Sequence, residues 1–171
     1  METDIRFTHQ NLVEECKKGI LSSQYELYAL YVDAMYNVGY RFLGNKEDAE
    51  DIVQDSFVDA FKNLGKFKYE SSFGAWLKRI VINKSINHLR AKRIALVPME
   101  VHEFHLTEDE PVEVDKVDIH KVKMGMAKLP EGYRQIINLY LIEGYDHVEI
   151  GEILNISTST SKSQYHRAKK K

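Results

Sequence analysis

The chain has 171 residues, of which 43% are hydrophobic and 29% are charged, and its formal net charge is −2. This composition fits one ordinary folded domain or two small ones and excludes an intrinsically disordered chain. No apolar run approaches the roughly 20 residues that a membrane span needs. The N-terminus lacks the pattern of a secretory signal, and the single cysteine, Cys16, cannot form an internal disulfide. We therefore expect a soluble protein of a reducing compartment, with Cys16 buried and inert.

The first half of the sequence predicts four helices, because long stretches have a hydrophobic period of 3.6 residues. The longest begins after a cap at Ser22 or Ser23 and stops at Gly44. Asn45 is expected to cap the next helix, which ends at Gly65. Small and apolar residues follow one face of that helix: Ala49, Ile52, Val53, Ser56, Phe57, Ala60, Phe61 and Leu64.

The face opposite this stripe is acidic, with Asp48, Asp51 and Asp55 on one side and Gln54 near them. Three interpretations are open: an ordinary solvated face, a docking surface for a basic partner, or a Mg²⁺ site similar to the Asp-rich motifs of all-helical prenyl-transferring enzymes. The metal site would require a second Asp-rich helix and a large apolar cavity. The sequence offers neither.

The predicted fourth helix, which Ser71 or Ser72 could cap, concentrates positive charge. Residues 71–98 include six basic side chains and no acidic one. A line of side chains at steps of three or four joins Trp76, Arg79, Asn83, Asn87 and Arg90. Cations neutralise phosphates and amides read base edges, so this stripe predicts contact with nucleic acid.

The segment before that helix interleaves basic and aromatic residues, as single-strand binding surfaces do: Lys66, Phe67, Lys68, Tyr69 and Phe73. The alternative is that Phe73 and Trp76 belong to the core and the cations to a solvated face. For Trp76 the core role is favoured, as a support beneath a base-binding loop. Apolar residues change sides along the helix, because Phe73, Trp76, Leu77, Ile80 and Val81 lie nearly opposite Ile82, Ile86 and Leu89.

Periodicity fails from residue 95 to residue 117, and residues 99–118 carry eight acidic side chains against one lysine. We interpret residues 95–117 as a flexible acidic linker between a first domain, 1–94, and a second, 118–171. Helices are expected in the second domain at residues 118–128, 130–143, 146–154 and 157–171, with Pro130 in a first helical turn and Gly144 at a helix end.

Residues 146–171 have the layout of a helix-turn-helix. Gly151 permits close approach, Asn155 takes a left-handed turn, and Ser157 caps the second helix, while the first helix is expected to bury Val148, Ile150, Ile153 and Leu154. The second helix is polar and basic, which suits the major groove. A solvated terminal helix is the alternative, but the turn, the cap and the apolar spacing favour DNA binding. The predicted contacts are Thr158, Ser159, Lys162, Ser163, His166 and Arg167.

With these parts assembled, the chain resembles a bacterial sigma factor of the extracytoplasmic-function (ECF) type, over about residues 13–93 and 124–171. The stretch that begins "NKEDAEDIVQDSFVDAF" is similar to the polymerase-binding and promoter-melting domain of that family, and the stretch that begins "LPEGYRQIINLYLIEGYDHVEIGEIL" to its −35 recognition domain. The resemblance implies an all-α fold of two small helical domains joined by an acidic linker. It also implies no catalytic group, no metal and no cofactor.

The resemblance further implies that Asp51, Gln54 and Asp55, with Asp48 beside them, lie on a helix that grips the clamp coiled coil of the largest subunit of RNA polymerase. Residues 67–73 would capture an unpaired base of the −10 element. The residues expected at this element are Phe67, Lys68, Tyr69, Ser71, Ser72, Phe73, Trp76, Arg79, Asn83, Asn87 and Arg90. The implied partners are core RNA polymerase, promoter DNA and an anti-sigma factor. The chain would be cytoplasmic in a bacterium, without inserting into a membrane, and held at the inner membrane by that factor.

The chain departs from the family pattern at Ser161, where an apolar residue is usual, and at Tyr165, which replaces an aliphatic one. We expect looser seating of the recognition helix, by about 1 kcal/mol. A stand-alone helix-turn-helix repressor and a Mg²⁺-dependent helical enzyme are the competing hypotheses. A repressor needs no strand-melting surface, and the enzyme would need a metal between Asp51 and Asp55.

Overall fold

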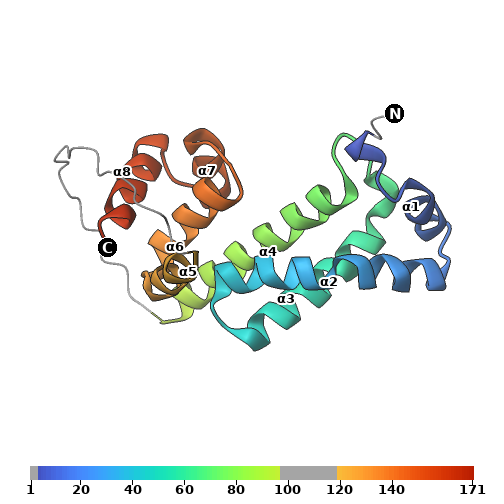
Figure 1. Cartoon of the computed structure of the whole chain (residues 1–171), viewed down its shortest axis with the longest axis horizontal. Helices are drawn as coiled ribbons and strands as arrows, with labels where there is room; N and C mark the ends of the chain where they lie inside the picture. The colour runs from blue at the N-terminus through green and yellow to red at the C-terminus, as the bar shows by residue number, and fades with distance from the viewer. Residues whose placement is uncertain (1–3, 97–118) are drawn as a thin grey trace. The chain divides into compact units, whose positions relative to one another are not determined.

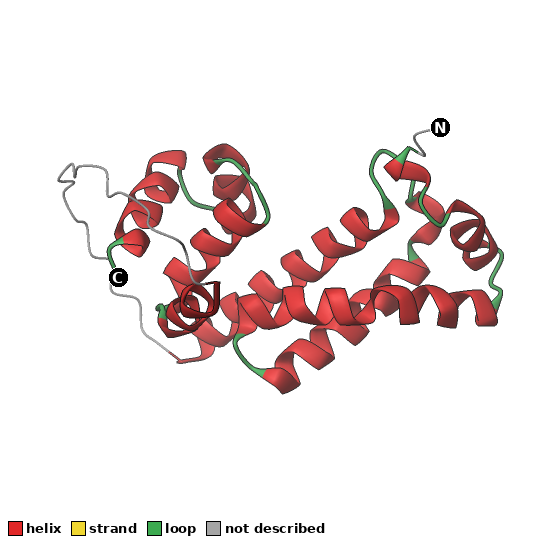
Figure 2. Cartoon of the chain, in the orientation of Figure 1, coloured by secondary structure: helices red, strands yellow, loops and turns green. Residues whose placement is uncertain are grey.

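The computed structural model describes residues 4–96 and 119–171, and these are helices joined by turns, with no strand drawn among them in Figure 2. The chain divides into two compact units, Met1–Leu89 and Arg90–Lys171. The all-α prediction is therefore confirmed. The predicted domain limits stay predictions. The helix that precedes the expected linker continues to Leu96, and residues 97–117 lie outside the described residues.

In the first unit, α2, α3 and α4 lie side by side, and α1 packs against α2 (Figure 1). Two short 3₁₀ turns, η1 and η2, precede α1 and follow α3. The bounds are η1 (Ile5–Phe7), α1 (Gln10–Lys17), α2 (Leu21–Leu43), α3 (Lys46–Lys62), η2 (Leu64–Lys66) and α4 (Phe73–Leu96), of which the part from Arg90 on is assigned to the second unit.

The turn between α2 and α3 forms as the sequence predicts. Gly44 ends α2 with a left-handed φ of 65°, which glycine adopts without steric cost. The side-chain oxygen of Asn45 accepts a hydrogen bond of 2.9 Å from the backbone N–H of Asp48. This bond satisfies one of the free donors at the start of α3. Both predictions are confirmed.

The predicted start of α2 is wrong. The helix begins at Leu21 after Ile20, so Ser22 and Ser23 lie inside its first turn rather than at its cap. The hydroxyl of Ser23 is buried and donates a 2.6 Å hydrogen bond to Glu15 on α1. The Ser23 hydroxyl therefore has its hydrogen-bond partner on another helix, whereas the sequence predicted a partner on the neighbouring backbone.

The predicted end of α3 is also displaced. The helix ends at Lys62 rather than at Gly65. At this end the side-chain amide of Asn63 and its backbone N–H both donate to the Asp59 carbonyl, at 2.9 and 3.0 Å, so Asn63 closes the last turn. The chain then turns through η2 toward the loop of residues 67–73.

The buried row of α4 winds around the helix instead of changing sides abruptly. Phe73, Leu77, Val81, Ser85 and Leu89 are all buried and stand four residues apart. A step of four exceeds one turn by about 40°, so the row drifts steadily and reaches the side of Ile82 and Ile86. A helix with this pattern keeps a buried side from Phe73 to Leu89 even though the two ends of the row face differently.

In the second unit, α6 packs against α8, and α7 packs against α8. The predicted helix of residues 130–143 is present, but its second half is a π-helical turn closed by a 2.9 Å bond from Glu143 N–H to the Asn138 carbonyl. Pro130 stands at the cap and Gly144 has a φ of 76° after the end. The bounds are α5 (Ile119–Lys128), α6 (Glu131–Ile137), η3 (Asn138–Ile142), α7 (His147–Leu154) and α8 (Thr158–Lys169).

Two sequence predictions concern the state of Cys16 and the membrane. Cys16 is buried, and the loss of solvent, helped by Glu15 and Glu26, raises the pKa of its thiol to about 11. A thiol with so high a pKa is protonated and a poor nucleophile, as expected. Among the helices of the described residues, none combines the length and apolar content that crossing a membrane requires.

Candidate nucleic-acid interface

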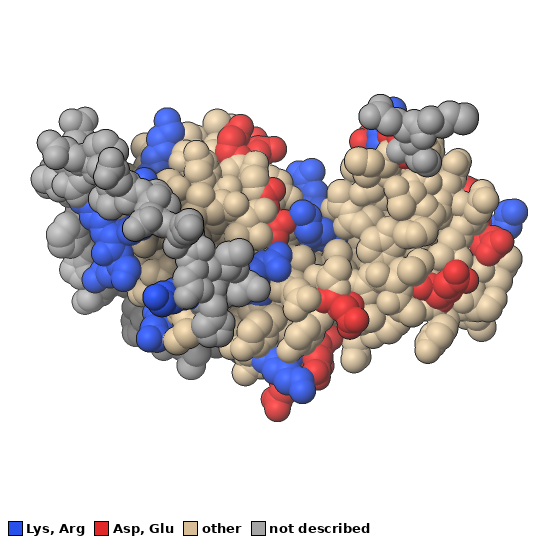
Figure 3. Space-filling model, viewed as in Figure 1, with Lys and Arg blue, Asp and Glu red and all other residues tan. Residues whose placement is uncertain are grey.

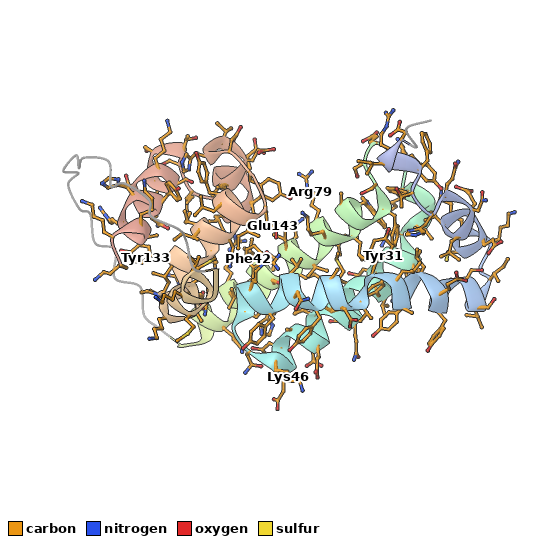
Figure 4. All side chains as sticks on the ribbon, in the orientation of Figure 1. Tyr31, Phe42, Lys46, Arg79, Tyr133 and Glu143 are labelled. Atoms are coloured by element: carbon orange, nitrogen blue, oxygen red, sulfur yellow. The ribbon has the colours of Figure 1, made fainter. Side chains whose placement is uncertain are left out.

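The acidic face of α3 lies at the surface. Asp51, Gln54 and Asp55 are exposed, while the opposite side of the helix is buried. Asp48 differs, because it is half-buried and its carboxylate lies 3.3 Å from the Nε2 of His88 on α4, an ion-pair distance when His88 is protonated. Acidic side chains at the start of α3 are visible in Figure 3 close to Lys46, which is labelled in Figure 4. Three of the four predicted side chains are therefore accessible to a partner.

The magnesium interpretation has no geometric support in the described ranges. Those residues contain no group of three or more His, Cys, Asp or Glu side chains that could hold a metal ion. Asp59, the next acidic residue along α3, is instead paired with Lys84 of α4 at 2.7 Å, and this contact lowers the pKa of the Asp59 carboxyl.

The polar stripe of α4 is exposed as a set. Arg79, Asn83, Asn87 and Arg90 all lie at the surface. Arg79 points away from α2 and α3 (Figure 4). Lys84, on a different side, is occupied by Asp59. The structure thus places cations and amides along one outer line of the helix, the arrangement that phosphate and base-edge contacts require.

The aromatic residues of the loop do not form an exposed stacking surface. Phe67 and Phe73 are buried, and the half-buried Trp76 ring lies against them at 5.2 and 6.0 Å between centroids. The prediction that these two phenylalanines are presented like the rings of a single-strand binding surface is wrong, because each contributes more by burial in the core. Trp76 packs against both rings, and its role beneath a base-binding loop stays a prediction.

The polar members of the loop are more accessible. Lys68 is exposed, while Ser71 and Ser72 are half-buried. Ser72, rather than Ser71, caps α4, since its hydroxyl accepts a 3.2 Å hydrogen bond from the N–H of Ala75. Of the predicted loop residues, Lys68 is the one whose whole side chain is available to DNA.

Tyr69 has an unusual backbone. Its φ is 58°, in the left-handed region. For a residue other than glycine or asparagine, this backbone conformation costs of order 1–3 kcal/mol. Its hydroxyl donates a 2.6 Å hydrogen bond to Glu14 of α1. Burial, and then this bond, raise the pKa of Tyr69. Sequence reasoning missed Glu14, because it is 55 residues away and no local pattern links the two.

The turn between α7 and α8 has the predicted geometry. Asn155 adopts a left-handed φ of 55°, and Ser157 accepts a 3.1 Å hydrogen bond from Thr160 N–H. A Cβ added to Gly151 would lie 2.8 Å from the backbone oxygen of Ile156, so only glycine fits there. Asp146 and Glu149 form a complete capping box at the start of α7.

Val148 is not part of the buried face of α7. Its side chain is 56% exposed, whereas Ile150 is fully buried and both Ile153 and Leu154 are half-buried. Two residues along a helix rotate the side chain by about 200°, so Val148 and Ile150 cannot face the same core.

The two departures from the family pattern have specific contacts. Ser161 is fully buried, and its hydroxyl lies 2.9 Å from Nδ1 of His147. The Tyr165 ring packs against Tyr140 at 4.5 Å and against His147 at 5.6 Å. A polar and aromatic group therefore occupies the place where aliphatic packing is usual. Burial and the nearby Lys162 lower the pKa of His147.

The predicted DNA-contact residues of α8 occupy one side of that helix, opposite its buried positions. Ser159 and Lys162 are exposed, and the others are half-buried. Ser163 donates a 2.9 Å hydrogen bond back to the Ser159 carbonyl. Residues at steps of three and four share a helix face, so one surface presents Ser159, Lys162, Ser163, His166 and Arg167, with Thr158 at its beginning.

Comparison with known proteins agrees with this geometry. The Sigma-70 region 2 family model matches residues 27–94, and the Sigma-70 region 4 model matches residues 120–171. The ECF RNA polymerase sigma factor SigW of Bacillus subtilis (strain 168) is 32% identical, over 92% of this chain and 90% of SigW. The RNA polymerase sigma-H factor of Pseudomonas aeruginosa is 30% identical, over 94% of this chain and 89% of that factor.

Solved structures give the same fold. CnrH in complex with the cytosolic domain of CnrY is 26% identical, with a TM-score of 0.52 over 92% of this chain and 90% of CnrH. The sigma factor RpoE in complex with the anti-sigma factor NepR, from Bartonella quintana, has a TM-score of 0.54 at 22% identity, over 85% of this chain and 91% of RpoE.

The chain belongs to the ECF-type RNA polymerase sigma factors of the sigma-70 family. It directs RNA polymerase in promoter recognition and transcription initiation, and it is not an enzyme. The sequence-based identification and function are confirmed, and the repressor and metal-enzyme hypotheses are excluded.

Proposed function

We propose that the two units divide the work of the sigma factor among three surfaces. The exposed face of α3 docks on core polymerase, the loop of residues 67–73 with the outer stripe of α4 acts at the −10 element, and α8 reads the −35 element. The observation that carries this proposal is the separation of charge by surface. α3 exposes carboxylates opposite its core face, while the α4 stripe and α8 expose only cations and neutral polar groups.

The polymerase contact rests on Asp51, Gln54 and Asp55. These side chains are exposed on one face of a helix whose other side is anchored by Ile52, Val53 and Ser56. A rigid row of carboxylates favours a basic partner and disfavours an acidic one by like-charge repulsion. The clamp coiled coil of the largest polymerase subunit is the partner that we assign to it.

Substitution of Asp55 tests this assignment. Because Asp55 is exposed, Asp55→Lys should leave the helical content and melting temperature unchanged while abolishing co-purification with core polymerase. Glu26→Lys, an equal change of charge at an exposed position of α2, is the matched control and should bind normally. Normal polymerase affinity of Asp55→Lys would contradict the proposal.

At the −10 element, Lys68 and the stripe of α4 supply the contacts. Arg79 and Arg90 neutralise phosphates, and Asn83 and Asn87 contact base edges of the adjacent duplex or of the separated strand. Phe67, Phe73 and Trp76 act from below, because their packed rings support the loop that receives the unpaired base. Strand separation costs a few kcal/mol for each unstacked step, which these contacts must offset.

An anti-sigma factor is the partner that we propose for regulation. The related CnrH was solved in complex with the cytosolic domain of CnrY. In this chain, α2 exposes several large apolar side chains that a partner could cover: Leu21, Tyr25, Leu30 and Tyr40. The chain would then reside in the bacterial cytoplasm and be retained at the inner membrane through that partner.

A further inference from the structure

The loop of residues 67–73 contains a backbone conformation that its own residue does not favour. Tyr69 has a φ of 58°, and a tyrosine has no local hydrogen bond from its side chain to its own backbone that would offset the steric cost. Such a conformation persists only where surrounding contacts impose it. The contacts around Tyr69 therefore identify what holds the loop.

Those contacts come from α1. Glu14 accepts the 2.6 Å hydrogen bond from the Tyr69 hydroxyl and a 2.8 Å bond from the ammonium group of Lys17. Lys17 lies 4.7 Å from the centroid of the Tyr69 ring and also donates a 3.3 Å hydrogen bond to the Phe67 carbonyl. The Glu14–Lys17 pair thus holds both the side chain of Tyr69 and the backbone two residues earlier.

The N-terminal turn adds a third contact. The ring of Phe7 in η1 stacks on that of Tyr69 at 5.6 Å, with 28° between the ring planes. On the inner side, Tyr69 contacts Phe67 at 4.7 Å, and Phe67 contacts Trp76. A continuous series of rings therefore runs from the N-terminal turn to the base of α4. The match to region 2 begins at residue 27, so it does not include Phe7, Glu14 or Lys17.

We propose that Glu14 and Lys17, with Phe7, are positioning residues that hold Tyr69 and the loop of residues 67–73 in the conformation that receives the unpaired −10 base. The inference rests on the proposed function of that loop. A loop that is ordered before DNA arrives loses less conformational entropy when the strand is captured, so more of the contact energy is available for melting. We call the contacts of Phe7, Glu14 and Lys17 with Tyr69 and the Phe67 carbonyl the latch. Removing the latch should therefore slow promoter opening and leave duplex binding by the second unit unchanged.

Loop position can be measured without DNA. Trp76 is the single tryptophan of the chain and contacts the loop through Phe67, so its fluorescence and its quenching by acrylamide report on the loop. Tyr69→Phe, which keeps the ring, and Glu14→Ala should both increase quenching at unchanged helical content. Glu26→Ala removes the same charge from an exposed position on α2 and should match the wild type.

Promoter opening is measured on a promoter that the wild-type chain and core polymerase select from a library randomised at the −10 element. A hydrogen bond to a charged group, at the lower end of its usual strength, corresponds to a factor of about ten, so Tyr69→Phe and Glu14→Ala should each reduce permanganate-detected opening by at least about tenfold. Gel-shift affinity for the closed complex should stay within about twofold, since the −35 contacts are intact. Glu14→Gln, which keeps an acceptor for the hydroxyl, should recover part of the activity.

Coupling between the two residues provides a further check. Because both changes break the same bond, the double variant Glu14→Ala/Tyr69→Phe should open promoters about as well as the weaker single variant, whereas independent sites would give additive losses. Tyr69→Gly removes the strain and the latch together, and it should open promoters poorly although its backbone adopts the same φ freely.

The possible failures are distinct. Unchanged Trp76 quenching in Tyr69→Phe, or wild-type opening by Tyr69→Gly, would overturn the latch itself. Increased quenching with normal opening would instead show that the latch exists but that the loop does not capture the base, which overturns the proposed function of the loop and this inference with it. Equal losses in duplex binding and opening would indicate a merely structural role and would also overturn it.

Discussion

Asn83 is the residue on which the proposed separation of melting from duplex binding can be tested directly. Its amide is exposed on the outer stripe of α4, away from the buried row of that helix. Asn83→Ala should reduce promoter opening by about tenfold, which corresponds to about 1.4 kcal/mol and lies at the lower end of the range for a lost base contact, and duplex binding by less. Permanganate footprinting and gel shift measure the two quantities. Equal losses in both would contradict the assignment.

His147 predicts a pH dependence of the helix-turn-helix. Burial and Lys162 hold the pKa of His147 below its ordinary value of 6.5, so between these two values the unfolded chain binds more protons than the folded chain. The contribution of neutral His147 to the free energy of unfolding is therefore fully present above about pH 6.5 and is lost as the pH drops through the pKa of His147 in the folded chain. Thermal melting of the full chain between about pH 7.5 and 5.5 should show a larger loss for the wild type than for His147→Gln. An identical loss in both would remove His147 as the cause.

The contacts of some single residues could be predicted from the sequence, and those of others could not. Gly44, Asn45, Asn155 and Ser157 were predictable because a cap or a left-handed turn depends on neighbours within three or four positions. The Tyr69 contact was not, since its partner lies on another helix 55 residues away. Local propensity carries no information on such pairs, and three-dimensional packing alone brings them together.

At the scale of elements, the turn between α7 and α8 allows a matched pair of substitutions. A Cβ at Gly151 would lie 2.8 Å from the Ile156 backbone oxygen, while one at Gly132 in α6 meets nothing within 4 Å. Gly151→Ala should destabilise the second unit by about 1–3 kcal/mol, the usual cost of overpacking, and weaken −35 binding.

Gly132→Ala is the control and should be neutral or stabilising by about 0.5–1 kcal/mol, because alanine costs less backbone entropy in a helix. Thermal melting and gel shift on −35 DNA measure both variants. If Gly151→Ala melted and bound like the wild type, the close approach at this turn would not restrict the residue that fits there.

The order and type of the helices followed from hydrophobic period alone, and their ends followed less well. Ser23 bonds across to α1, and α3 ends at Lys62 rather than at Gly65. The π-helical turn after α6 had no sequence signal either, since one extra residue in a turn hardly changes the apolar period. For the interface, exposure of the α4 stripe was predictable from its spacing. The burial of Phe67 was not, because an aromatic next to lysines fits a surface and a core equally well.

At the scale of the whole molecule, charge is segregated along a chain whose net charge is only −2. Positions 71–98 hold six basic residues and positions 155–171 hold five, with no acidic residue in either block, and residues 99–118 between them hold eight acidic residues and one lysine. A block that carries only positive charge attracts polyanions within about one Debye length, roughly 8–10 Å at physiological salt. Two separate basic blocks therefore favour two separate contacts with DNA, one for each unit.

The acidic segment between these blocks gives the last prediction, which rests on its sequence. We propose, from this charge run alone, that the segment occupies a basic channel of the polymerase until the transcript displaces it. Neutralising Glu108, Asp109 and Glu110 as Gln, Asn and Gln would weaken that attraction. The growing transcript should then displace the segment more easily, so fewer short abortive products should accumulate and promoter escape should be faster. In vitro transcription that counts abortive and full-length products measures this effect, and Glu26→Gln/Asp33→Asn, at the two exposed acidic residues of α2, is the control. Unchanged abortive initiation and escape would remove the channel role and would leave the acidic run as a solvated spacer between two DNA-binding units.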